Sequence, residues 1–154
     1  MSIKKIVTIG ESILRQRANE IDLDEIRTDV FRCLVENMIE TMRAAQGVGL
    51  AAPQIGINQR VFVAETSAGP IALINPKFTK MSKKTTPYEE GCLSIPGKYG
   101  LVRRATEVDI EALTLEDKKI TFTAKGFFAR VMQHEMDHLD GILFVDRIEE
   151  QNRT

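Results

Sequence analysis

The chain has two histidines, His134 and His138, and both lie within the short sequence QHEMDH. If this segment is helical, the spacing of four places both imidazoles on one face, about a turn apart, where they can bind one metal ion. Glu135 follows the first histidine directly, in the place of a general base for metal-assisted hydrolysis. Two histidines at this spacing can also be ordinary surface or core residues, so the metal-binding helix is a hypothesis that needs support from the rest of the chain.

The hydrophobic pattern predicts a helix, then strands, then a second helix. Residues 24–45 have apolar side chains about every four positions, which is typical of a long amphipathic N-terminal helix. Cys33 lies close to that apolar stripe and is expected to be a small buried thiol. The histidines fall in the last helix, residues 126–139, which glycines open and close. The predicted strands are residues 60–64, 71–75, 78–85, 107–114 and 119–124. Their short connections without helices favour antiparallel pairing and an α+β fold.

Length and composition predict a single domain over residues 1–154. A chain of 154 residues, 43% of them apolar, can bury its own core. No repeat, low-complexity tract or linker marks a domain boundary. The formal net charge of -1 provides no bulk attraction for nucleic acid or membranes, which favours small or peptidic partners. The N-terminal residues lack an apolar run long enough for a secretion signal, so we expect a cytoplasmic protein.

A catalytic metal site usually has three protein ligands, so the histidine pair needs a third. In metzincin proteases the pattern continues to another histidine, but Phe144 stands at that position. In thermolysin-type sites a downstream glutamate completes the set, and only Glu149 and Glu150 remain here. The other soft donor is Cys92, in a turn of sequence EGCLS, whose thiolate would complete a site of one Cys and two His. A metalloprotease and a noncatalytic metal-stabilised module are the alternatives to this interpretation.

A glycine-rich segment, GVGLAAPQ at residues 47–54, follows the first helix. Its small residues allow close approach of a ligand or of another backbone, and Gln54 can donate an amide hydrogen bond. The segment lacks the lysine and the final Ser or Thr of a phosphate-binding loop. On its own it is more typical of a tightly packed turn than of a site.

Together, the three segments resemble the peptide deformylase family, whose members remove the N-formyl group from new bacterial proteins. That family carries the motifs GφGφAAxQ, EGCxS and QHExDH in this order, where φ is apolar, and here they read GVGLAAPQ, EGCLS and QHEMDH. The resemblance continues to LFVDR at residues 143–147 and so covers essentially one whole domain. It implies antiparallel β-sheets packed around a central C-terminal metal-binding helix.

The resemblance also implies the roles of the site residues. The implied metal ligands are Cys92, His134 and His138. The implied catalytic groups are Glu135 as general base, and Gln54 and the backbone N–H of Leu93 as donors to the developing oxyanion. The implied native metal is Fe(II), with zinc, nickel or cobalt able to occupy the same site, whereas Cys and His ligation alone would suggest zinc. Glu90 and Arg104 could pair and hold the Cys92 turn, although an exposed pair contributes little stability.

For the substrate, the resemblance implies N-formylmethionyl peptides bound as an added strand beside the backbone of Val48, Gly49 and Gly91. The methionine pocket would be formed by Val48, Tyr88, Phe127, Arg130 and Val131. Ordinary core packing is an alternative for Phe127 and Val131. The stem of Arg130 could line the pocket wall while its charged head reaches water.

The remaining expectations concern partners. Longer family members carry a C-terminal helix that can engage the ribosome, whereas this chain stops soon after residues 148–151. We therefore expect ribosome association to be weak, with no membrane partner and no direct contact with nucleic acid. The protein is expected to be a monomer in a bacterial cytoplasm, encoded by a bacterium or by a phage.

Overall fold

A computed structural model describes residues 2–149, and the expected C-terminal tail, residues 150–154, lies outside the described residues. The helices are α1 (Leu23–Ile26), α2 (Asp29–Ala44) and α3 (Gly126–Leu139). The strands are β1 (Gly49–Ala51), β2 (Val61–Thr66), β3 (Gly69–Met81), β4 (Thr85–Cys92), β5 (Ile95–Ala105), β6 (Glu107–Leu113) and β7 (Lys119–Lys125). Short 3-10 helices, η1 (Ser12–Arg15), η2 (Ala52–Ile55) and η3 (Phe144–Asp146), complete the described elements. None of the helices in this part of the chain is long and apolar enough to cross a membrane.

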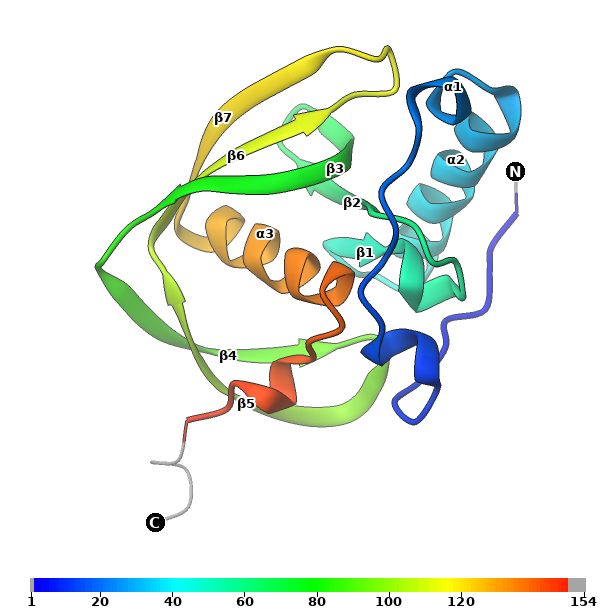
Figure 1. Ribbon diagram of the computed structural model, residues 1–154. Helices are drawn as coiled ribbons and strands as arrows, with labels where there is room; N and C mark the ends of the chain where they lie inside the picture. Colours follow the sequence, from blue (N-terminus) through cyan, green and yellow to red (C-terminus); the bar gives the residue numbers. More distant parts are fainter. Residues whose placement is uncertain (1, 150–154) are drawn as a thin grey trace.

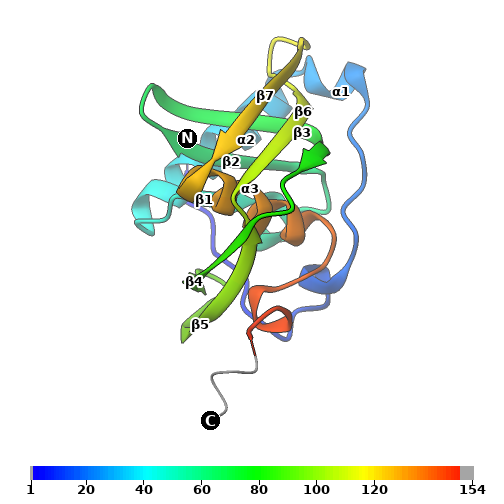
Figure 2. The ribbon, with the colours of Figure 1, turned by 90° about the vertical axis from the view of Figure 1, so that its left-hand side faces the viewer.

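The strands form two antiparallel sheets that diverge from a common corner. The larger sheet has the order β1-β2-β3-β6-β7, and the smaller one is the ribbon β4-β5. β3 leads into β4 and β5 into β6 through short turns, so the sheets open like a V, with α3 inside it (Figure 1). Figure 2 shows the same strands passing from the larger sheet to the ribbon. The antiparallel α+β class predicted from the sequence is confirmed.

Both faces of the larger sheet are covered by a helix. Side chains alternate between the two faces of a strand, so neighbours on β2 enter different cores. Phe62 packs in the core that contains Met132 and Leu139 of α3. Val63 packs in the core that contains Val35 and Met38 of α2. β1, at the edge of this sheet, therefore lies between the two helices and close to the histidine-bearing α3.

The predicted helix over residues 24–45 is broken near its start. α1 ends at Ile26, and α2 begins after Thr28, whose Oγ1 accepts a hydrogen bond from the Phe31 backbone N–H at 3.1 Å. This bond is a typical N-cap, which satisfies a free amide of the first turn and starts a new helix. The expectation for Cys33 was wrong: its side chain is exposed, because the buried face of α2 runs through Phe31 and Val35 instead.

Two predicted strands, residues 71–75 and 78–85, belong largely to one strand, β3. Its pairing with β6 shifts between Ile74 and Lys77. Pro76 has no N–H to donate, and Asn75 has a left-handed backbone with φ 49°, so the ladder is irregular here without ending. The β4-β5 ribbon was not predicted at all, and it carries the Cys92 turn.

Candidate active site

The three predicted ligands lie together where α3 meets the tip of the β4-β5 ribbon. His134 and His138 share one face of α3, with ring centroids 5.0 Å apart. Cys92 ends β4 just before the two-residue turn to β5, and its Sγ is 3.3 Å from Nε2 of His138. One ligand atom from each of the three residues lies within 4.8 Å of the other two. The predicted turn and helix therefore form one cluster of donors.

The chemistry of this cluster fits a transition-metal ion. Burial lowers the pKa of His134, but hydrogen bonds to Cys92 and Glu90 and the charge of Glu135 outweigh it and raise the pKa to about 10. The surroundings therefore favour a positive charge here, which a metal ion would supply once the ring had lost its proton. Burial lowers the pKa of His138, which keeps that imidazole neutral as a ligand must be. One thiolate and two imidazoles are the donor set of zinc and iron sites.

Glu90 fixes the orientation of the His134 ring through a hydrogen bond on its Nδ1 side. Its Oε1 is 3.0 Å from Nδ1 of His134, which leaves Nε2 of that ring for a ligand. Arg104 donates two bonds of 3.0 Å to the same carboxylate, and Arg130 donates a third at 2.7 Å. Burial raises the pKa of Glu90, but the hydrogen bonds to His134 and Arg104 outweigh it and bring the pKa to about 2. The carboxylate is therefore ionised.

Two expectations about these arginines are corrected. The Glu90–Arg104 pair is buried, with both side chains less than 7% exposed, and Arg104 also binds Asp137 at 2.6 Å. The head of Arg130 does not reach water, because it donates to Glu90 and to the backbone oxygens of Val102 and Thr86. These bonds connect α3 to the ribbon that carries Cys92.

Replacing Arg104 with methionine should lower the free energy of unfolding by about 3–5 kcal/mol, because the two buried carboxylates of Glu90 and Asp137 would lose their shared partner. Urea unfolding measures this. Arg43→Met is the matched control, since Arg43 pairs with Glu65 on the surface and its loss should have little effect. Equal unfolding curves for both variants would contradict a stabilising role for the buried network.

Glu135 points into the cavity beside the ligand cluster, against β1. A Cβ on Gly49 would come within 2.7 Å of Oε1 of Glu135, so only glycine leaves room for this carboxylate. Oε2 of Glu135 is buried and has no hydrogen-bond partner in the described residues. Burial raises the pKa of Glu135 to about 7. A carboxyl group with this pKa can accept and return a proton near neutral pH.

Gln54 is held between β1 and the Cys92 turn. Its Oε1 accepts a hydrogen bond from the Ala51 backbone N–H at 3.0 Å. Its Nε2 donates to Oγ of Ser94 at 3.1 Å and lies 3.6 Å from Sγ of Cys92. The amide donor is therefore fixed next to the ligand cluster, and Leu93 lines the same cavity.

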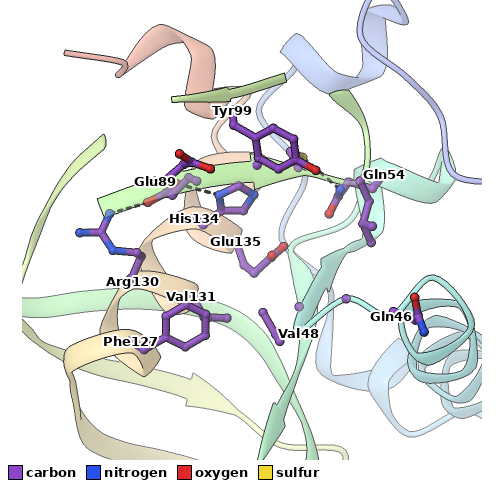
Figure 3. A pocket seen from close by; sticks show the side chains of 16 residues that line it. Gln46, Val48, Gln54, Glu89, Tyr99, Phe127, Arg130, Val131, His134 and Glu135 are labelled. Atoms are coloured by element: carbon purple, nitrogen blue, oxygen red, sulfur yellow. Dashed lines mark hydrogen bonds and ion pairs between the residues drawn. The ribbon is translucent and has the colours of Figure 1, made fainter. Parts of the chain in front are cut away.

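A cavity of about 340 Å³ opens beside these groups (Figure 3). Of the predicted substrate residues, six line it: Val48, Gly49, Gly91, Phe127, Arg130 and Val131. Tyr88 is not among the lining residues; its ring packs 6.3 Å from that of Phe127, centroid to centroid, and lies under the guanidinium of Arg130. Gln46, Gly47, Glu89 and Tyr99 also line the cavity and were not predicted.

Tyr99 and Gln46 depend on features that local patterns do not reveal. A Cβ on Gly91 would come within 2.6 Å of the Tyr99 ring, so the tyrosine lies directly over that glycine. The register of the ribbon, which pairs Glu90 with Gly100, brings them together. The sequence predicts the turn at Cys92 but not the two strands that flank it, and the pairing of these strands is what places Tyr99 over Gly91.

Two unpaired strand edges also meet at the cavity. Within residues 2–149, β1 pairs only with β2, and β4 pairs only with β5. Gly49 of β1 and Gly91 of β4 both line the cavity. An extended peptide could therefore hydrogen-bond to backbone on either side.

Comparison with known protein sequences points to one family. The family model described as polypeptide deformylase matches residues 3–154. The chain is 46% identical over 147 residues to the peptide deformylase of Pelotomaculum thermopropionicum, covering 96% of this chain and 92% of that protein. It is 45% identical over 147 residues to the peptide deformylase of Fusobacterium nucleatum, covering 95% of this chain and 84% of that protein.

Solved structures extend this similarity to the fold. The peptide deformylase from Thermotoga maritima has a TM-score of 0.91 at 38% identity, covering 96% of this chain and 98% of that one. The class I type b peptide deformylase from Acinetobacter baumannii, in its Met-Ala-Ser bound form, has a TM-score of 0.90 at 35% identity, covering 95% of this chain and 98% of that one.

Proposed function

The chain belongs to the polypeptide deformylase family, and we propose here the residues that carry out its reaction. It is a metal-dependent hydrolase that removes the N-formyl group from the formylmethionine of new proteins. The observation that carries the proposal is a cluster of one Cys and two His that lies at one cavity together with a buried glutamate and a fixed amide; of the two histidines, His134 lines the cavity. We also propose that residues 1–154 form one catalytic domain, in which α3 is the central metal-bearing helix.

We assign metal binding to Cys92, His134 and His138. The donor set and the acidic surroundings of His134 support this assignment. When bound, the metal supplies a Lewis acid that polarises the formyl carbonyl and lowers the pKa of water. For the native ion we propose Fe(II), as the family resemblance implies, with zinc, nickel or cobalt able to substitute for it.

Glu135 moves the proton in this proposal. It takes a proton from the attacking water and returns it to the amine nitrogen as the C–N bond breaks, so that formate and a free N-terminus leave. Its burial and its pKa of about 7 support both steps, because neither direction of transfer is strongly uphill near neutral pH.

Gln54 and the backbone N–H of Leu93 are the proposed donors to the oxyanion that forms on the formyl oxygen. A donor that is fixed before the reaction needs no reorganisation when charge develops. The bonds of Gln54 to Ala51 and Ser94 hold its amide in this way.

Gln54→Ala should lower kcat by about a hundred- to a thousandfold, because a positioned oxyanion donor is lost, while the metal content stays the same. Formate release and metal analysis measure the two quantities. Gln54→Glu keeps an acceptor for the Ala51 N–H but loses the amide donor, so it should lose activity as well. Gln59→Ala is the control and should keep its activity, because the Gln59 side chain bonds Glu25 at the surface and does not line the cavity. An active Gln54→Glu variant would mean that the amide donor is not needed.

The substrate is proposed to lie as an added strand between β1 and β4, with its methionine side chain among Val48, Phe127 and Val131. The two unpaired edges and the apolar residues at the cavity support this, as does the peptide bound to the A. baumannii relative. Main-chain pairing suits an enzyme that accepts many sequences. We further propose that it acts as a monomer in the cytoplasm, where new chains are made, with at most weak ribosome association.

Formate release from formyl-Met-Ala-Ser by the metal-loaded protein tests the function, with cleavage of an internal peptide bond measured in parallel. We expect formate and no internal cleavage. Phe144, which the metzincin pattern would require to be histidine, packs against the His134 ring with centroids 6.4 Å apart. Internal cleavage without formate would replace the proposal with a protease.

A further inference from the structure

The first described residues, 2–9, run without regular secondary structure from α2 to the tip of the β4-β5 ribbon, and we call them the N-terminal strap. Figure 1 shows the strap at the blue end of the colour scale. Its start is anchored on α2 by two backbone N–H groups. Ser2 donates to Oδ1 of Asn37 at 2.7 Å, and Lys4 donates to Oγ1 of Thr41 at 2.8 Å.

The second half of the strap bonds two residues of the proposed oxyanion site. Val7 N–H donates to the backbone oxygen of Gln54 at 2.8 Å. Ile9 N–H donates to the backbone oxygen of Ser94 at 2.9 Å. Gln54 and Ser94 are themselves joined, because the Gln54 amide donates to Oγ of Ser94 at 3.1 Å. The strap therefore connects η2 to the ribbon tip at the pair that holds the amide donor.

The ribbon alone does not fix the position of Ser94. Its ladder ends at the pair of Cys92 and Ile95, and Leu93 and Ser94 form the two-residue turn beyond it. The turn residues of a hairpin lie outside the ladder of hydrogen bonds. Ser94 is fully buried, so its backbone oxygen needs a partner inside the protein. Ile9 supplies this partner from outside the ribbon.

Side chains of the strap also pack beside this turn. Ile6 packs against the same core as Leu93, and Val7 packs against the same core as Cys92. Successive side chains of an extended chain point to opposite sides, which is why neighbours in the strap enter different cores. The strap is thus fixed by packing as well as by its hydrogen bonds.

We propose that Val7 and Ile9 are positioning residues, whose backbone N–H groups hold Gln54 and Ser94 so that the Gln54 amide faces the formyl oxygen. This role rests on the proposed function of Gln54. Neither Val7 nor Ile9 lines the cavity, so both act through their partners and do not touch the substrate. A small displacement of a group that must be fixed before the reaction lowers the rate strongly. The strap therefore contributes to kcat and not to substrate binding.

Ile9 can be replaced with proline because it lies in a turn that accepts proline. Glu11 N–H donates to Thr8 O at 3.2 Å, which closes a turn of four residues. Gly10, at the third position, has φ 109°, whereas Ile9, at the second, has negative φ. This is the pattern of a type II turn, in which proline is common at the second position. Ile9→Pro therefore removes the N–H that binds Ser94 without a change in the turn.

The test measures kcat and KM for formyl-Met-Ala-Ser, together with metal content and Tm, in metal-loaded variants. Ile9→Pro should lower kcat by roughly 2- to 10-fold, as expected for one lost hydrogen bond, with KM and metal content unchanged. Val7→Pro removes the bond to Gln54 and should act in the same way. Lys5→Pro is the control and should keep the kcat of the wild type, because Lys5 is exposed and its N–H bonds no other described residue.

The same substitution in a Gln54→Ala background separates positioning from a general effect on the fold. Ile9→Pro should lower kcat no further there, because the amide that the strap positions is already gone. Ile9→Ala keeps the N–H, so it measures what the side chain of Ile9 contributes by itself.

An unchanged kcat in Ile9→Pro and Val7→Pro would overturn the inference, even if the Tm fell, because the strap would then be structural only. An equal loss in Lys5→Pro or Ile9→Ala, or a further loss in the Gln54→Ala background, would overturn it as well. A wild type that releases no formate, or a Gln54→Ala variant with full kcat, would instead refute the proposed function, which is a separate result.

Discussion

Glu135→Gln should lower kcat for deformylation by a factor on the order of 10⁴ while the protein keeps its fold and its metal. A single group serves both proton transfers in the proposed reaction, so its loss falls at the upper end of what general acid–base catalysis contributes. Glutamine matches glutamate in size, so it fits the space that Gly49 leaves without a side-chain clash. Formate release under saturating substrate, with metal content and Tm measured on the same samples, separates loss of chemistry from loss of structure.

Glu36→Gln provides the control for this substitution, because Glu36 is an exposed carboxylate on α2 and its change should leave kcat as it is. A Glu135→Gln variant with full metal and near-normal kcat would remove Glu135 from the mechanism. In that case the raised pKa of this buried group would have a structural cause only.

Cys92→Ala should weaken metal binding by more than about a hundredfold and abolish activity at limiting metal. Outer-shell partners of a ligand already contribute about 10- to 100-fold in affinity, and a direct thiolate ligand contributes more. Competition with a chelator measures the affinity, and anaerobic handling protects Fe(II) and the thiol during the titration.

The chain supplies its own control for this change. Cys33 is the other cysteine and is exposed on α2, away from the cavity, so Cys33→Ala should bind metal with the affinity of the wild type. Equal affinities in Cys92→Ala and Cys33→Ala would show that the third ligand had been chosen wrongly, and the two histidines would then need another partner.

The sequence predicted best where a local pattern determines local structure. The helix that carries the histidines was predicted with its correct ends, because its apolar residues repeat at helical spacing and glycines stand at both ends; Gly126 and Gly141 both have positive φ. The β4-β5 ribbon gave no such pattern. Thr85 to Glu89 are exposed on both faces, so hydrophobic alternation, the main signal of a strand, is missing.

The residues of the site show the same contrast between what a local pattern predicts and what only the folded chain reveals. The metal cluster could be proposed because its residues belong to sequence motifs, and the structure brings them together. The burial of Arg130 could not, because its partner Glu90 lies 40 residues earlier and only the closed fold joins them. Without that partner a long charged side chain is expected to reach water. The positions of Gln46 and Tyr99 at the cavity could not be predicted either. The first depends on where α2 ends, and the second on the register in which β4 pairs with β5.

The free edges of β1 and β4 have a further consequence for how the protein behaves in a crowded cell. An unpaired edge normally recruits strands from other molecules and leads to aggregation. Here both edges border one cavity of about 340 Å³, so a peptide bound there as an added strand would pair with both of them. The substrate would thus cover the same edges that bind it, and only the protein without substrate would present them to other copies of itself.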